Sequence, residues 1–70
     1  MDELREGMTM DEIHRAGAAR FGGGAWMAAN MTVVAGVRAV GMEPGDFGVE
    51  AKMMLSAIAF AVCAERQRKG

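Results

Sequence analysis

The chain has 70 residues, 51% of them hydrophobic, and a formal net charge of −1. The hydrophobic fraction argues against intrinsic disorder, and the balanced charge argues against the broad basic surface typical of nucleic-acid binding. One cysteine, Cys63, and one histidine, His14, exclude an internal disulfide framework and the usual Cys/His zinc sites. A chain of this length buries only about 60% of its unfolded surface, so we expect oligomerisation or partner binding to complete its stability.

Residues 1–8 are predicted to form a polar lead-in, in which Gly7 interrupts any helix. The first residues, Met1-Asp2-Glu3-Leu4, are acidic, whereas a secretory signal begins with positive charge followed by an apolar run. We therefore expect a cytoplasmic protein. Residues 9–70 are predicted to form a single small helical domain.

The first helix is predicted over residues 9–20. Thr9 and Glu12 have the spacing of a capping box, in which each side chain accepts a hydrogen bond from the other residue's backbone N–H. The run Gly22-Gly23-Gly24 then ends the helix, and we interpret it as a flexible hinge. The apolar stripe of this helix consists of Met10, Ile13, Gly17 and Phe21.

A second helix is predicted over residues 25–40. Arg38 is the only charged residue between Trp26 and Met42, which is unusual for a helix that faces water on one side. A second stripe places small residues at every fourth position, a spacing that lets another backbone approach closely. This stripe consists of Ala28, Thr32 and Gly36, and the main apolar face consists of Trp26, Ala29, Val33, Val37 and Val40.

Asn30 and Arg38 are polar residues within this apolar helix. They lie eight positions apart and therefore on roughly the same side. A single polar residue in an apolar seam can fix register and partner number. We therefore place Asn30 and Arg38 at the rim of an interface, or in a buried polar contact within it.

The sequence Glu43-Pro44-Gly45-Asp46 predicts a turn, followed by a third helix over residues 47–68 with Asp46 as its N-cap. No charge occurs from Met53 to Ala64. Because the turn is short, the second and third helices are predicted to form an antiparallel hairpin. The main apolar face of the third helix consists of Met54, Leu55, Ile58, Ala61 and Val62.

No catalytic, cofactor-binding or metal-binding residues are predicted. The glycine run lacks the sixth-position glycine of a dinucleotide loop, where Met27 stands, and it lacks the Walker lysine. His14 has no serine or cysteine at a readable spacing, and the hydroxyl of Ser56 is expected to bond to a carbonyl one turn earlier in its helix. Cys63 is interpreted as a buried structural thiol. We therefore expect neither an enzyme nor a cofactor.

In its two apolar helices, tight turn and charged tail, the segment 25–70 resembles the two-span class of phage holins in architecture. That resemblance implies a membrane hairpin. A membrane span needs about 20 apolar residues, whereas Trp26–Met42 supplies 17 and includes Asn30 and Arg38. The stretch Met53–Ala64 supplies only 12. Length therefore favours a chain outside the membrane over a holin-like one.

These patterns predict an all-α fold, with a short N-terminal helix and an antiparallel helical hairpin, assembled as a homo-oligomer with a dimer favoured. The expected function is non-enzymatic protein–protein interaction, in which the module self-associates and docks on a larger protein. By analogy of size and style, it would be an accessory or inhibitory protein of a mobile element such as a phage, for example an inhibitor of a bacterial defence complex. A structural assembly subunit and a small two-helix membrane hairpin are the alternatives. The predicted interface residues are Trp26, Asn30, Val33, Val37, Arg38, Met53, Met54 and Ile58.

Overall fold

The computed structural model describes Leu4, Arg5 and residues 7–69, and that part of the chain is helical without any strand. The elements are α1 (Met10–Phe21), α2 (Gly23–Ala39), a 3-10 turn η1 (Pro44–Asp46) and α3 (Val49–Lys69). The predicted all-α class is therefore confirmed. The three predicted helices correspond to α1, α2 and α3, with ends that differ by one or two residues.

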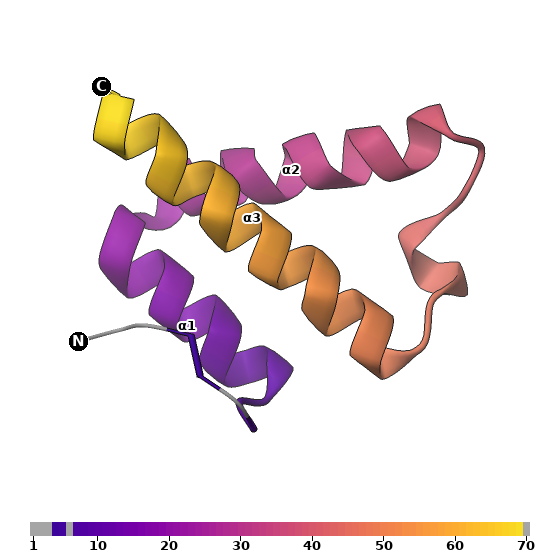
Figure 1. Ribbon diagram of the computed structural model, residues 1–70, viewed down its shortest axis with the longest axis horizontal. Helices are drawn as coiled ribbons and strands as arrows, with labels where there is room; N and C mark the ends of the chain where they lie inside the picture. Colours follow the sequence, from indigo (N-terminus) through magenta and orange to yellow (C-terminus); the bar gives the residue numbers. More distant parts are fainter. Residues whose placement is uncertain (1–3, 6, 70) are drawn as a thin grey trace.

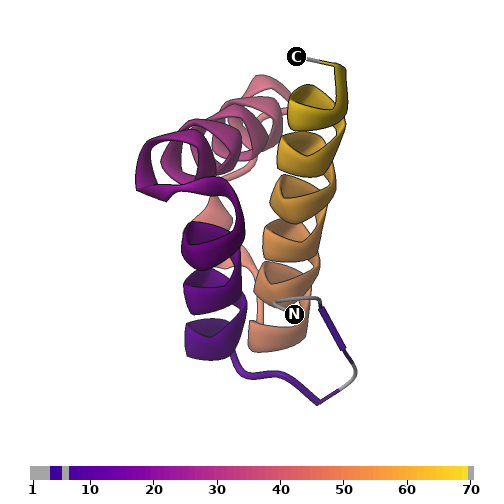
Figure 2. The same cartoon turned by 90° about the vertical axis from the view of Figure 1, so that its left-hand side faces the viewer.

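Helices α1 and α2 form a V that closes at Gly22, and α3 lies across both arms (Figure 1). Helices α1 and α3 run side by side in the same direction, as Figures 1 and 2 both show. Helix α2 runs in the opposite general sense to α3 and crosses it obliquely. The close antiparallel hairpin is therefore not confirmed. The two helices diverge toward the segment that contains η1, so this segment spans a gap and is not a tight turn.

The joint between α1 and α2 is a single residue, Gly22, with φ 91° and ψ 145°. Its N–H donates to the Ala18 carbonyl at 2.9 Å, and its carbonyl accepts from the Trp26 N–H at 2.9 Å. One residue therefore caps the end of one helix and the start of the next. The prediction of a three-residue hinge is corrected: Gly23 and Gly24 belong to α2, because one glycine with positive φ is enough to redirect the chain.

The start of α1 has the predicted capping box. The Thr9 N–H donates to Glu12 Oε1 at 2.8 Å, and the Glu12 N–H donates to Thr9 Oγ1 at 3.2 Å. The residues before Thr9 also belong to the folded unit, because Met8 is buried in the core and Leu4 packs against it. Within the described residues, the lead-in is therefore not a separate polar segment.

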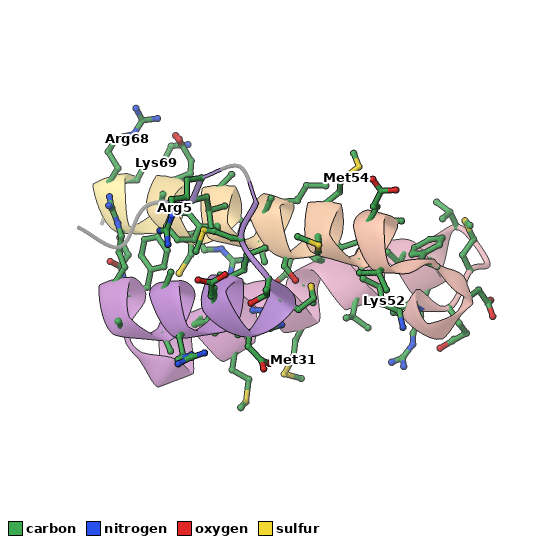
Figure 3. The ribbon with its side chains drawn as sticks, turned by 90° about the horizontal axis from the view of Figure 1, so that it is seen from below. Arg5, Met31, Lys52, Met54, Arg68 and Lys69 are labelled. Carbon is green, nitrogen blue, oxygen red and sulfur yellow. The ribbon has the colours of Figure 1, made fainter. Side chains whose placement is uncertain are left out.

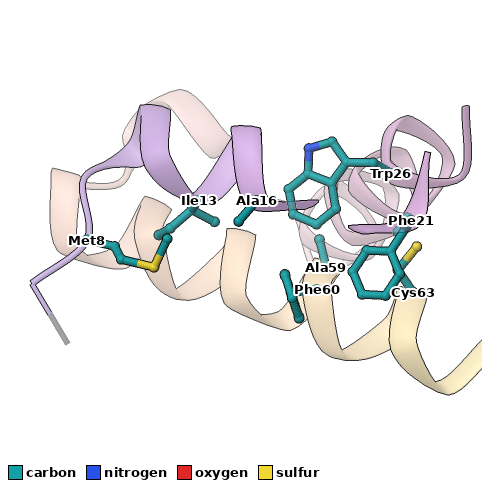
Figure 4. Close-up of a cluster of buried hydrophobic side chains, with 9 residues drawn as sticks. Met8, Ile13, Ala16, Phe21, Trp26, Ala59, Phe60 and Cys63 are labelled. Atoms are coloured by element: carbon teal, nitrogen blue, oxygen red, sulfur yellow. The ribbon is translucent and has the colours of Figure 1, made fainter. Parts of the chain in front are cut away.

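The buried core lies mainly toward the closed end of the V (Figure 4). Trp26 and Phe60 pack edge to face with ring centroids 6.2 Å apart, and Phe21 and Phe60 do so at 4.8 Å. Such aromatic pairs add about 1 kcal/mol each beyond the burial of their area. The core consists of Met8, Ile13, Ala16, Phe21, Trp26, Ala29, Ala59, Phe60 and Cys63.

Helix α3 buries a different face from the one its largest aliphatic residues suggest. Its buried residues are Ser56, Ala59, Phe60 and Cys63, whereas Met54 and Ile58 are 67% and 50% exposed. Small Ala59 lets α3 approach the other helices closely, and Phe60 supplies the aromatic ring that Phe21 and Trp26 contact. The predicted N-cap is also corrected, since Asp46 lies in η1 and the Gly48 carbonyl accepts from the Lys52 N–H at 3.0 Å.

Candidate association surfaces

The outer side of α2 is an exposed face made mostly of small residues. Five of them recur at alternating intervals of three and four, which is the spacing of seam positions in a coiled coil. All five are exposed, and we call them the α2 seam: Ala25, Ala28, Thr32, Ala35 and Ala39. Two of the three residues of the predicted small-residue stripe, Ala28 and Thr32, belong to this seam. The third, Gly36, lies at its edge.

Larger apolar side chains stand beside the α2 seam. Met27 and Met31 are 64% and 65% exposed. Figure 3 shows Met31 pointing away from α3, on the side of the molecule opposite Met54. On the other edge, a Cβ added at Gly36 would meet nothing within 4 Å. Another backbone can therefore come close to α2 along this face.

The polar atoms of α2 that lie near this face already have partners within the chain. Thr32 Oγ1 donates to the Ala28 carbonyl at 3.0 Å and accepts from Arg66 Nη2 at 3.1 Å. On the inner, half-buried side of α2, Asn30 Nδ2 donates to the Trp26 carbonyl at 2.7 Å. At the end of α2, Arg38 pairs with Glu43 at 3.2 Å, with both side chains exposed. A partner that covered this side of the helix would therefore also cover the charged Arg66 guanidinium beside Thr32.

The outer face of α3 is a second exposed surface, and it differs in charge. Met54, Ile58 and Ala61 are exposed along it. Toward the C-terminal end it becomes polar, where Glu65 forms an ion pair with Arg68. A shallow groove in this region is lined by Ile58, Ala61, Val62, Glu65, Arg66 and Lys69. This surface therefore combines aliphatic side chains with charges of both signs.

The predicted interface residues do not form one continuous surface. Trp26 is 6% exposed and packs inside the chain. Asn30, Val33, Val37 and Met53 are half-buried. Among the exposed members, Met54 and Ile58 lie on α3, and Arg38 lies near the end of α2. The structure thus packs the buried and half-buried members of the predicted interface against its own core. The exposed members are divided between α2 and α3.

The three residues considered for chemistry make structural contacts. Trp26 Nε1 donates to His14 Nδ1 at 3.2 Å, so this imidazole nitrogen is already used as an acceptor between α1 and α2. Ser56 Oγ lies 3.9 Å from the Met10 thioether sulfur, which corrects the predicted bond to a carbonyl in its own helix. Cys63 is 2% exposed. These side chains join helices, and the contacts described place no nucleophile beside a base.

Within the described residues, no group of three or more His, Cys, Asp or Glu side chains is placed to hold a metal ion. None of the helices in that part of the chain combines the length and the apolar character that a bilayer crossing requires. Comparison of the chain with protein-family models found no matching family, and comparisons with curated proteins and with solved structures found no match either.

The sequence analysis missed three residues of the α2 seam, namely Ala25, Ala35 and Ala39. The signal that identifies them is the alternation of intervals of three and four residues from Ala25 to Ala39. It was hidden because the seam contains alanine and threonine, where a coiled coil normally carries leucine or valine. The stripe with a residue at every fourth position drifts around a helix, whereas the alternating spacing stays on one side.

Proposed function

We propose that this chain is a non-enzymatic helical interaction module that self-associates and docks on a larger protein. The observation that carries the proposal is the exposure of apolar side chains on two opposite sides of the molecule. Met27 and Met31 are exposed on α2, and Met54 and Ile58 are exposed on α3. Large apolar side chains exposed in this way are candidates for association surfaces.

Because the chain is so small, we propose that it acts as an accessory or inhibitory protein toward a larger complex. The outer face of α3 supports it, because aliphatic residues beside charges of both signs are typical of non-obligate interfaces. Flexible methionines such as Met54 adapt their shape to different partners. We assign docking on the larger protein to this face, with Ile58 near its centre.

A structural assembly subunit is the second candidate. It is favoured by the placement of Met31 and Met54 on opposite sides of the molecule (Figure 3). Two different apolar binding surfaces on opposite sides allow each copy to bind two others, which produces rings or open filaments. The proposed module and the assembly subunit therefore differ in whether association stops at two copies.

Light scattering after size exclusion, without detergent and over a wide range of protein concentration, tests self-association. The module predicts a molar mass of twice the chain mass of 7.4 kDa. A mass well above two chains, either fixed as for a closed ring or growing with concentration as for a filament, would favour the assembly subunit. A mass of one chain at every concentration would contradict both candidates.

Docking on a larger protein is tested by affinity capture from the cells that naturally produce the chain. The variant Ile58→Glu should lose the captured protein, because the new charge lies in the centre of the proposed docking face. Ala35→Glu, on α2, is the matched control and should retain it. Retention by Ile58→Glu would remove the outer face of α3 from the proposal.

A further inference from the structure

We propose that the cleft at the open end of the V binds a short-chain carboxylic acid, with the carboxylate held at Lys52 and Ser56 and the apolar body lying between the helices. This inference goes beyond the proposed function and does not depend on it. The cleft has a volume of about 190 Å³, and α1, α2, η1 and α3 all contribute to its lining. It is separate from the exposed outer faces of α2 and α3.

Helix α3 presents one face to this cleft. The residues that it contributes are Lys52, Leu55 and Ser56, which lie at intervals of three and four positions. Side chains at such intervals are neighbours on the same side of a helix. Figure 3 shows that Lys52 leaves α3 on the side opposite Met54. The cleft therefore lies on the inner side of α3, away from the face to which we assign protein docking.

Lys52 gives the cleft a positive charge that the chain itself does not neutralise. Among the described residues that line the cleft, Lys52 is the only charged one. Within the same part of the chain, no carboxylate forms an ion pair with Lys52. Glu43, which precedes the Pro44 of the lining, pairs with Arg38 at 3.2 Å. An ammonium group at the edge of a cleft without carboxylates favours an anionic ligand.

Ser56 supplies a buried hydroxyl on the same face. It is 5% exposed, and the contact described for its Oγ is with the Met10 sulfur at 3.9 Å. A thioether is a weak acceptor, so the hydroxyl can donate more strongly to another group. Hydrogen bonds to an ionised acceptor are the stronger ones. Because Ser56 lies one helical turn from Lys52, both can bind the same carboxylate.

The remaining lining is mainly apolar and sets the size of the ligand. Met10 from α1, Val33 and Val34 from α2, and Leu55 from α3 are half-buried there. An apolar cavity of about 150 Å³ holds one benzene ring, so a cleft of about 190 Å³ suits a body of similar size. Drug-sized ligands occupy about 300–1,000 Å³. We therefore infer a short acid such as hexanoate and not a nucleotide.

His14 connects the cleft to Trp26. It lines the cleft, and its Nδ1 accepts from Trp26 Nε1 at 3.2 Å. Because an indole N–H can only donate, the proton of the neutral imidazole lies on Nε2. A ligand that contacts His14 is therefore one hydrogen bond away from the indole. Trp26 is the only tryptophan, so its indole N–H gives a single NMR signal that reports on the cleft.

Titration with hexanoate at neutral pH tests the proposal, with hexanamide as the neutral ligand of nearly the same shape. So small a ligand is expected to bind with a dissociation constant of about 1 mM, so the titration extends to about 10 mM. NMR of the 15N-labelled protein should show saturable shifts at the Trp26 indole and at the amides of Val33 and Leu55. Hexanamide should bind about fivefold more weakly, because it lacks the charge.

A matched pair of lysine variants tests the role of charge. Lys52 and Lys69 are both exposed, and Lys52 is the one that lines the cleft. Lys52→Gln should weaken hexanoate binding about fivefold, whereas Lys69→Gln should leave it unchanged. Ser56→Ala should weaken it about tenfold, because a hydrogen bond to a charged group is lost. Circular dichroism checks that each variant keeps the wild-type helix content.

Each other outcome overturns a defined part. Equal affinity for hexanoate and hexanamide, or equal weakening by the two lysine variants, would remove the carboxylate from Lys52. Full affinity in Ser56→Ala would remove the hydroxyl. Shifts confined to the outer faces of α2 and α3 would overturn the site, and the absence of saturable shifts would overturn the proposal. Light scattering of the same samples decides self-association separately, so the two proposals fail independently.

Discussion

Gly17 is the residue at which the Trp26 ring lies directly against α1. A Cβ placed on Gly17 would come within 2.5 Å of the ring carbons Cδ2 and Cε3, a distance that real Cβ atoms do not adopt. The ring has little room to withdraw, because it is buried and packs edge to face on Phe60. A glycine in the middle of α1, which costs helix propensity, is therefore explained by packing.

Gly17→Ala is expected to destabilise the protein by about 1–2 kcal/mol. Alanine gains up to about 1 kcal/mol of helix propensity over glycine, but overpacking a filled core costs about 1–3 kcal/mol. Urea unfolding measures the difference. The matched control is Gly24→Ala, a helical position with open space around it, which should be neutral or stabilising. Equal effects of the two substitutions would contradict the close contact between Gly17 and Trp26.

Glu12 is expected to make stability depend on pH in the acid range. Hydrogen bonds from the Thr9 backbone and the Thr9 hydroxyl lower the pKa of its carboxyl below the usual 4.5, with Arg5 contributing further. The unfolded chain then binds the proton more readily, so the contribution of Glu12 is complete above the unfolded pKa. It is lost as pH falls through the lower folded pKa. Glu12→Gln should flatten the acid limb of a stability–pH curve, and an unchanged slope would refute this assignment.

At the scale of the elements, the joint at Gly22 fixes how α1 meets α2. Its φ and ψ values lie in a region that essentially only glycine adopts, at a cost of about 1–3 kcal/mol for other residues. We expect Gly22→Ala to destabilise by that amount in urea unfolding. Gly23→Ala, one position further and inside α2, should have little effect, because open space surrounds Gly23. A Gly22→Ala variant as stable as wild type would show that the joint can adopt other angles.

How far the elements could be predicted from the sequence depends on how polar each helix is. Helix α1 carries enough charge for its capping box and apolar stripe to be read directly, and the structure has both. Helix α3 is apolar on all sides across its middle, so its pattern does not indicate which face turns inward. Phe60 and Ala59 decide that orientation through contacts with residues far away in the sequence, which no local pattern contains.

The sequence indicates that exposed apolar surfaces exist on α2 and α3, but not which residues form them. The lack of charge in α2 and α3 correctly indicated exposed apolar surface. Trp26 was assigned to an interface as a member of the main apolar face of its helix, but it packs against Phe60 and His14 within the chain. Contacts with residues far away in the sequence thus bury the Trp26 side chain, whereas several alanines of α2 remain exposed.

At the scale of the whole molecule, the chain is thin, with extents of 33 × 28 × 16 Å. Two layers of helices leave little interior, so most of each helix remains within reach of solvent. The open end of the V is only half-buried, as Val33, Val37 and Leu55 show. A second copy packed on an exposed helix face would add a third layer, which is how short helical chains reach the burial of larger domains.

The thermal stability of the whole molecule is expected to depend on its concentration. If folding and pairing are coupled, each hundredfold rise in concentration stabilises the dimer by about 2.7 kcal/mol. Calorimetry at several concentrations should show Tm rising for the wild-type protein. A constant wild-type Tm would mean that pairing adds nothing to the stability of the fold.

The position of Trp26 gives the molecule an internal optical reporter. It is the only tryptophan, it is buried on the inner side of α2, and its indole contacts His14 and Phe60. Its fluorescence should therefore follow unfolding and remain unchanged by association at the exposed surfaces. Emission and scattered light, recorded on one sample, would then separate the loss of the partner from the loss of the fold.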